Sequence, residues 1–145
     1  MKPFQYRAKV VRVIDGDSIV VDIDLGFHLW VRDRNIRLKN IDTPEFRTTD
    51  LVEKKFGTLS KEVVESFLPP GKKILLETDM SDNDKFGRIL GTVVIETVNG
   101  QINLNEYLLE NHYAVPYEGQ NKDQIEEAHI QNRKILIESG KITVD

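Results

Sequence analysis

The stretch IRLKNIDTPE, residues 36–45, decides how the sequence is interpreted. Within it, apolar residues at positions 36 and 38 alternate with Arg37 and Lys39. A period of two is that of a β-strand with one buried face, so the two cations are expected on the opposite, outer face. The same alternation in residues 18–25 predicts that this strand belongs to a curled sheet, with a site on its outer surface or at its mouth.

Two carboxylates, Asp42 and Glu45, flank Thr43-Pro44 where the strand ends. Aspartate followed three residues later by glutamate is also the form of a helix N-cap, and that alternative stays open. Residues 46–50 show no helical apolar period, which weakens it. Pro44 favours extended backbone at Thr43, which could hold the Thr43 carbonyl and the Asp42 carboxylate toward one point.

Two further motifs bring charged side chains to the ends of apolar strands. Residues 13–18, VIDGDS, place Asp17 just past an Asp-Gly pair, which is first of all a hairpin turn. Residues 84–88, DKFGR, supply Arg88, although they equally fit a plain turn, and Arg37 or Arg88 alone could be a surface ion-pair partner. Arginine binds phosphate oxygens bidentately, and carboxylates bind hard cations. Two arginines and three carboxylates together predict a phosphodiester-cleaving site.

The hydrophobic period changes from two to 3.6 after residue 51. Apolar side chains at 52, 56, 59, 63 and 67 form one helical stripe, which Pro69-Pro70-Gly71 ends. Residues 73–78 and 89–97 return to strand character, and Asn99-Gly100 predicts a turn. Short capped helices are expected over 103–111 and 123–139, the last one ending at Gly140.

These elements predict an α+β, mainly β fold in a single domain spanning residues 1–145. Five strands with three interspersed helices fit a small curled barrel better than a doubly wound sheet, because repeated βαβ units need more helical connections. A chain of 145 residues is large enough to bury about two thirds of its unfolded surface.

Composition excludes several chemistries. With no cysteine, neither a disulfide framework nor a thiolate site is possible, and three histidines without ligand spacing argue against a zinc enzyme. No stretch has the roughly 18 apolar residues of a membrane helix, so no membrane partner is expected. If Met1 is the natural start, the lack of a signal core predicts a cytoplasmic protein; if a leader preceded it, the protein is secreted.

The net charge of −4 argues against tight binding to nucleic acid. Its distribution weakens that objection, since residues 1–100 carry 16 basic and 16 acidic side chains and the excess lies in residues 101–145. A basic surface could therefore form, or the same residues could be an ordinary solvated face. The residues concerned are Arg32, Arg34, Arg37, Lys39, Arg47, Lys54 and Lys55.

Together the motifs resemble those of the staphylococcal nuclease (thermonuclease) family, over roughly residues 10–134. The matching pieces are residues 13–18, 36–45, 84–88 and Asn105-Glu106. The resemblance implies an OB-fold-like five-stranded barrel with three helices. It also implies calcium-dependent endonuclease activity on DNA and RNA that leaves a 5′-hydroxyl and a 3′-phosphate.

The resemblance also implies a role for each matching residue. Asp17, Asp42 and the Thr43 carbonyl become Ca²⁺ ligands, Glu45 the general base, Arg37 and Arg88 the phosphate-binding pair, Lys85 a substrate-phosphate contact, and Tyr117 part of the nucleotide pocket. Phe86 departs from the family pattern, which has tyrosine there, so one hydroxyl contact to substrate is missing.

Two other classes of protein remain as alternatives. One is a catalytically silent OB-type module that binds nucleic acid or a protein. Such modules typically lose site residues, whereas this sequence keeps the two arginines and three carboxylates: Arg37, Arg88, Asp17, Asp42 and Glu45. The other is a calcium-binding structural domain, which would not need two arginines. We expect a monomer whose partner is DNA, RNA or both.

Overall fold

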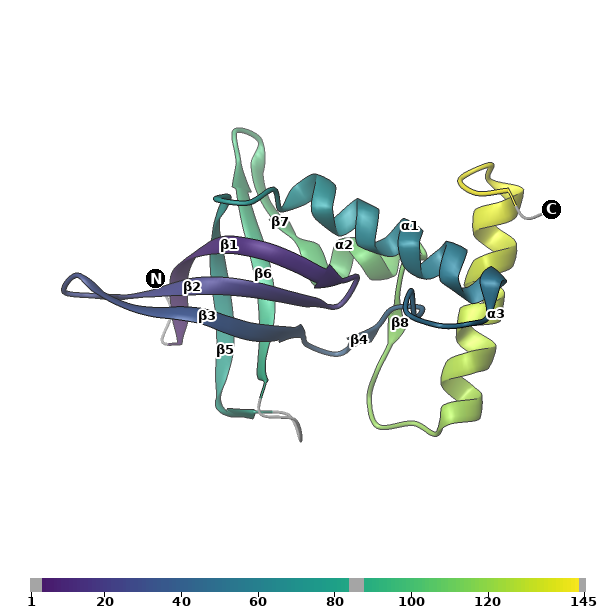
Figure 1. Cartoon of the computed structure of the whole chain (residues 1–145), viewed down its shortest axis with the longest axis horizontal. Coiled ribbons are helices and arrows are strands. Elements are labelled where there is room, and N and C mark those ends of the chain that lie inside the picture. The colour runs from purple at the N-terminus through teal and green to yellow at the C-terminus, as the bar shows by residue number, and fades with distance from the viewer. Residues whose placement is uncertain (1–3, 84–87, 144–145) are drawn as a thin grey trace.

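A computed structural model describes residues 4–83 and 88–143, and it has the predicted architecture of a closed β-barrel with three helices (Figure 1). The strands are β1 (Gln5–Asp15), β2 (Ser18–Gly26), β3 (Leu29–Leu38), β4 (Ile41–Asp42), β5 (Lys73–Asn83), β6 (Ile89–Thr97), β7 (Gly100–Asn103) and β8 (Val115–Pro116). The helices are α1 (Leu51–Phe67), α2 (Leu104–Glu110) and α3 (Lys122–Glu138). The α+β, OB-fold-like prediction is confirmed.

Five strands close the barrel. They pair in the order β3-β2-β1-β5-β6, and a parallel pairing of β3 with β6 joins the two ends of the sheet. Alternate side chains of β2 and β3 point into the core, where Ile19, Val21 and Ile36 have no exposed surface. Burying a side chain of this size stabilises the fold by about 1.5–3 kcal/mol.

The sequence located the long elements well and missed the short ones. The turn at Asn99-Gly100 leads back into β7 before α2 begins, and β5 continues five residues beyond the predicted end at 78. The two-residue strands β4 and β8 pair with each other outside the barrel. They are too short to show a hydrophobic period in the sequence. The prediction of five strands therefore describes the barrel and not every strand.

Helix α1 packs on the barrel through a line of residues close to the predicted stripe. Phe56, Ser60 and Val64 are buried, whereas Val52 in the first turn is exposed. Leu68, which precedes Pro69, ends the helix with non-helical backbone (φ −125°, ψ 62°), in agreement with the bias of such residues away from helical geometry. In Figure 1, α3 lies at the opposite end of the molecule from the β2–β3 hairpin, beside α1 and β8.

Gly57 allows the chain around Glu45 to lie directly on α1. A Cβ atom at this position would be 2.5 Å from the Glu45 carbonyl group and from the Phe46 nitrogen. These are backbone atoms, so no side-chain movement can relieve the clash. The glycine therefore fixes how closely the segment after β4 approaches the helix.

Replacing Gly57 with alanine should destabilise the protein. The strain of overpacking, about 1–3 kcal/mol, is resisted here by backbone and should exceed the gain of about 1 kcal/mol in helix propensity. Urea denaturation measures the free energy of unfolding. Glu65→Ala, on the exposed side of the same helix, is the control and should change it by less than about 0.5 kcal/mol. A Gly57→Ala variant as stable as the wild type would contradict the close contact.

Candidate active site

The β1–β2 hairpin turn forms the floor of the site. Asp15 pairs with Ser18 across the turn, and the Asp17 backbone N–H donates to Asp15 Oδ1 at 3.1 Å. Gly16 allows the turn to lie against Thr43, since a Cβ there would be 2.9 Å from the Thr43 hydroxyl oxygen. The Asp-Gly pair is therefore a turn, as expected, and it also places the Asp17 carboxylate in a buried position beneath the site.

The segment after β4 is bound to this turn by hydrogen bonding. The Thr43 backbone N–H donates to Asp17 Oδ2 at 3.1 Å, and Thr43 is itself buried. The alternative that Asp42 caps a helix is wrong. Helix α1 begins at Leu51, and its N-cap is Asp50, whose side chain accepts from the N–H groups of Val52 and Glu53.

Arg37 lies between two carboxylates. Its Nη1 atom is 3.3 Å from Asp17 Oδ2 and its Nη2 atom is 3.5 Å from Asp42 Oδ1. It also donates to the Leu38 carbonyl oxygen at 3.1 Å. The ring of Tyr117 lies 6.0 Å from its guanidinium carbon. One cation thus balances two acids that come from different segments of the chain.

Barrel closure brings the second arginine to the same place. In the β3–β6 pairing, Arg37 is opposite Leu90, two residues after Arg88. Arg88 donates to the Ser18 hydroxyl group at 3.3 Å, which lies 3.4 Å from Asp17 Oδ1. The two arginines therefore approach Asp17 from two neighbouring strands.

These side chains line one cleft of about 810 Å³. Of the residues predicted for the site, it brings together Asp17, Arg37, Asp42, Glu45, Arg88 and Tyr117. Thr43 is buried beside the cleft, and Lys85, like Phe86, lies outside the described residues. Asp15 also lines it, which the sequence interpretation missed although this residue belongs to the same Asp-Gly-Asp motif.

Negative charge accumulates in the cleft. Burial raises the pKa of Asp15 to about 7, and a carboxyl–carboxyl hydrogen bond and repulsion from Asp17 add to the effect. The pKa of Glu45 is also raised, first by partial removal from water and then by repulsion from Asp17 and Asp42. A cleft that favours protonation of its acids also favours a bound cation.

His129 on α3 is the main residue that sequence reasoning missed. It is buried, with 8% of its surface exposed, and its Nε2 atom lies 2.7 Å from Asp42 Oδ2. Because the partner is a carboxylate, Nε2 is the protonated, donating nitrogen when Asp42 is ionised. The two residues are 87 positions apart, so nothing local in the sequence signals the contact.

The donor atoms suit a hard cation better than a soft one. Within residues 4–83 and 88–143, no three histidine, aspartate or glutamate side chains form a cluster of metal ligands. Asp17 and Asp42 each place one carboxylate oxygen beside the Arg37 guanidinium. Carboxylate oxygens supplemented by a backbone carbonyl are the ligands of Ca²⁺ or Mg²⁺.

Comparison with known proteins identifies the family. The model of the staphylococcal nuclease homologue family matches residues 35–136. The chain is 30% identical to thermonuclease of Staphylococcus hyicus over 129 residues, covering 88% of this chain and 71% of that protein. It is 31% identical to endonuclease YhcR of Bacillus subtilis over 118 residues, which cover 78% of this chain and 9% of that protein. An uncharacterized protein of Methanocaldococcus jannaschii is 32% identical over 77% of this chain and 59% of its own length.

The structure thus defines the class of protein. It is a mainly β barrel with a charged cleft at the ends of β1, β3 and β6. The chain belongs to the staphylococcal nuclease homologue family. Two of the relatives carry nuclease names, and the resemblance seen in the sequence motifs is confirmed. Within the described part of the chain, no helix has the length and apolar character needed to cross a membrane.

The raised pKa of Asp15 predicts how stability depends on pH without divalent cations. The folded protein binds this proton with a pKa of about 7, whereas the unfolded chain binds it with the ordinary pKa of 3.8. The contribution to stability is therefore complete below the lower value and is lost as the pH rises through about 7. In EDTA, the melting temperature should fall between about pH 4 and pH 7 and level off above that range, as circular dichroism can measure.

Asp15→Asn is the matched variant for this effect, since it keeps the shape and removes the titration. Its melting temperature should fall less over the same range, with a residual slope from Glu45, whose pKa is raised in the same direction. Identical pH profiles for the variant and the wild type would show that Asp15 is not responsible.

Proposed function

We propose that this protein is a calcium-dependent endonuclease that hydrolyses the phosphodiester bonds of DNA and RNA to 5′-hydroxyl and 3′-phosphate products. The observation that carries the proposal is the convergence of Arg37, Arg88, Glu45 and the pair Asp17 and Asp42 on one cleft. Relatives named thermonuclease and endonuclease support it. The chain spans only part of most of these proteins, so their activities support the proposal by analogy.

In this proposal, the side chains of Asp17 and Asp42 hold Ca²⁺ together with the Thr43 carbonyl oxygen. A bound Ca²⁺ neutralises charge on the phosphate oxygens and orients the attacking water. His129 keeps the Asp42 carboxylate in place through its 2.7 Å contact with Oδ2, leaving Oδ1 toward Arg37 and the cleft. Hydrogen bonds of this kind fix the orientation of ligating carboxylates.

Glu45 is the proposed general base. It takes a proton from water as the water oxygen attacks phosphorus. The bond to the 5′ oxygen breaks, and this oxygen takes a proton from solvent and leaves as the 5′-hydroxyl. Its raised pKa brings it nearer to neutral pH, which makes the carboxylate a better proton acceptor. Arg37 and Arg88 bind the equatorial oxygens on which negative charge increases, and their planar forks hold them bidentately. Lys85 and Tyr117 are proposed to bind the substrate phosphate and nucleotide.

The direct test is digestion of plasmid DNA and of RNA with Ca²⁺, Mg²⁺ or EDTA. We expect cleavage with Ca²⁺ and none with EDTA. Glu45→Gln should reduce turnover by about 10²- to 10⁴-fold, the usual contribution of a general base. Arg37→Lys and Arg88→Lys should also lose rate, because lysine keeps the charge and loses the fork.

Exposed charges away from the cleft provide the control, and Lys134→Gln on α3 should cleave like the wild type. If all three site variants retain full activity, the catalytic residues lie elsewhere. If the wild type cleaves no substrate under any condition, the protein is a silent nucleic-acid- or protein-binding module.

Calcium should also raise the melting temperature, because a cation that binds only the folded chain stabilises it by RT ln(1 + [L]/Kd). The gain is about 2.7 kcal/mol at a hundredfold excess over Kd. Asp17→Asn should reduce it by removing a ligand. His129→Ala should lower calcium affinity by about 10- to 100-fold, as loss of a partner that orients a ligand typically does.

His28→Asn is the control for the histidine variant. This exposed residue lies at the tip of the β2–β3 hairpin, where asparagine accepts its positive φ of 62°. Its calcium-induced gain should equal that of the wild type. An unchanged wild-type midpoint at millimolar calcium would contradict the proposed metal site.

A further inference from the structure

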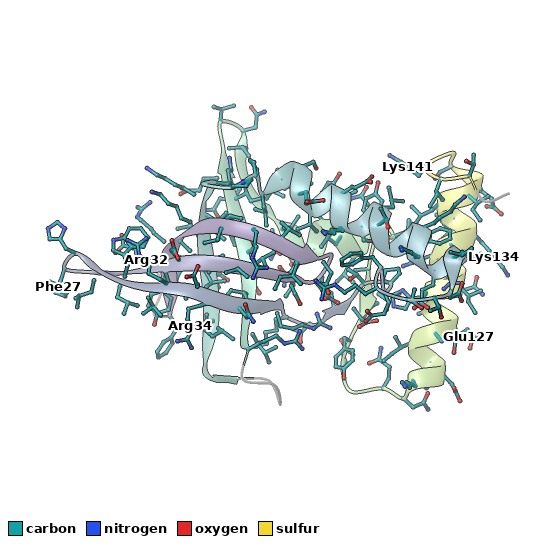
Figure 2. All side chains as sticks on the ribbon, viewed as in Figure 1. Phe27, Arg32, Arg34, Glu127, Lys134 and Lys141 are labelled. Atoms are coloured by element: carbon teal, nitrogen blue, oxygen red, sulfur yellow. The ribbon has the colours of Figure 1, made fainter. Side chains whose placement is uncertain are left out.

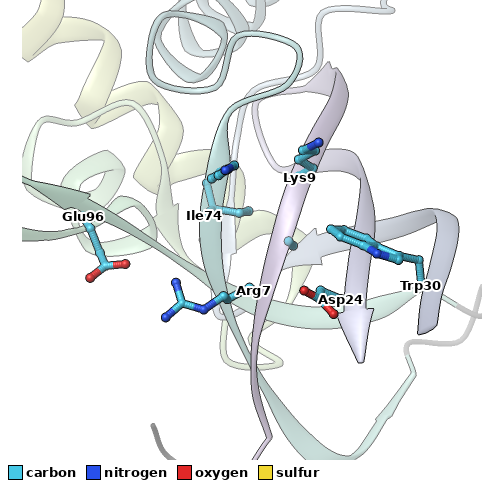
Figure 3. Close-up of a pocket in the computed structure, with 8 residues that line it drawn as sticks. Arg7, Lys9, Asp24, Trp30, Ile74 and Glu96 are labelled. Carbon is cyan, nitrogen blue, oxygen red and sulfur yellow. The ribbon is translucent and has the colours of Figure 1, made fainter. Parts of the chain in front are cut away.

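A second hollow lies on the outer face of the barrel, away from the cleft. It has a volume of about 270 Å³ and is bounded by β1, β2, β3, β5 and β6 (Figure 3). Its lining includes the side chains of Arg7, Lys9, Lys73 and Trp30. The register explains the arrangement, because Lys9 is opposite Lys73 on one side, while Arg7 and Trp30 are both opposite Asp24.

The cations of this hollow make no close ion pairs among the described residues, although Lys9 lies opposite Asp22 on β2 and contributes to lowering the pKa of Asp22. Within the part of the chain that the structure describes, Arg7, Lys9 and Lys73 make no ion pair, and the contact of Lys9 is with the ring of Trp30. The acidic neighbour Asp24 uses its Oδ1 atom to accept from the Gly26 backbone N–H at 2.8 Å. Three exposed cations thus surround a hollow whose acids, Asp24 and Glu96, do not pair with them.

Trp30 is the only tryptophan in the chain and is 36% exposed. Lys9 lies 6.0 Å and Arg32 5.0 Å from the centre of its ring. Arg32 is held there by an ion pair with Asp22 at 3.0 Å. An exposed ring with cations around it is the arrangement by which proteins bind single-stranded nucleic acid, since bases stack on the ring and phosphates bind the cations.

Strand β3 connects the hollow with the cleft. From Trp30 it continues through Arg32 and Arg34, both exposed, to Arg37 at the proposed catalytic site. Seven residues of strand span about 23 Å, at 3.3 Å per residue. Arg32 and Arg34 lie on the same side of the molecule as the hairpin tip at Phe27, far from α3 (Figure 2).

We propose that this hollow is a second binding site for single-stranded nucleic acid, which takes the part of the substrate strand that extends beyond the cleft along β3. The inference rests on the proposed function for the identity of the ligand. The Arg32–Asp22 pair and the exposed Asp33 limit the positive charge along β3, so Trp30 and the three unpaired cations provide most of the binding.

The fluorescence of the single tryptophan tests the site directly. In EDTA, where no cleavage is expected, a single-stranded 20-nucleotide DNA should quench Trp30, and a trinucleotide should quench it far less at equal phosphate concentration. Lys9→Glu and Lys73→Glu should each weaken binding of the long strand. Each should also reduce the slope of log K against log salt concentration by about one, which is the contribution of one phosphate contact. Lys134→Glu, which makes the same change of charge on α3, should bind like the wild type.

Affinity for the labelled 20-mer, measured by fluorescence anisotropy, should fall about 5- to 30-fold in Trp30→Ala, as expected for loss of one base-stacking contact. Phe27→Ala is the matched control, because this ring is 95% exposed at the hairpin tip and should leave the affinity unchanged. With calcium, Trp30→Ala should raise KM for the long strand and leave KM for the trinucleotide unchanged.

Each other outcome decides against one of the two proposals. Binding of the 20-mer without quenching, and with equal affinity in Trp30→Ala, would overturn the second site and leave the endonuclease proposal intact. Equal quenching by polyglutamate at the same charge would assign the hollow to acidic peptides and overturn it as well. Quenching by DNA without cleavage in calcium would support the second site and contradict the endonuclease.

Discussion

The position of Arg37 between Asp17 and Asp42 is the interaction on which the rest of the site depends. The two acids reach it from a hairpin turn and from β4, 25 residues apart in the sequence. Without a cation between them, the two ionised carboxylates would repel each other and favour protonation. Isolated charges are costly to bury, and the Arg37 guanidinium offsets that cost through an ion pair with Asp17 and a charge-assisted hydrogen bond to Asp42. The Thr43 N–H donates to the same Asp17 oxygen, Oδ2, that Arg37 contacts, so the orientation of Asp17 follows from both partners.

The barrel makes this arrangement possible by closing. Parallel pairing of β3 with β6 places Arg88 beside Arg37, and a sheet left open at this point would separate the two arginines. Two helices then fix the carboxylates from outside the barrel: α1 through the close approach at Gly57, and α3 through His129. The helices therefore do more than cover the core, because each restrains one acidic segment of the cleft.

Local signals explain which features the sequence could predict. Asp15-Gly16 and Pro69-Pro70 determine backbone geometry where they stand, and the buried line of α1 shows as a helical period, so these features were found. The contact of His129 with Asp42 depends on how α3 packs, and no residue near either one reports it. The same holds for the pairing of β4 with β8, which needs the completed fold. Roles of individual residues came from resemblance, whereas their convergence on one cleft is a property of the three-dimensional structure.

A nucleic-acid strand bound at β3 would interact with the local charges of that surface rather than with the net charge of −4. The acidic excess belongs to residues 101–145, and α3, which holds four of their eight acidic and three of their four basic side chains, lies at the far end of the molecule from the β2–β3 hairpin (Figure 1). Exposed charges separated by more than a Debye length, about 8 Å at physiological salt, are largely screened from each other. The local field at β3 is therefore set by Arg32, Arg34 and the cations around Trp30, reduced by Asp22, Asp24 and Asp33. Because these cations are few, base stacking on Trp30 must contribute a large share of any affinity, which distinguishes this surface from a purely electrostatic one.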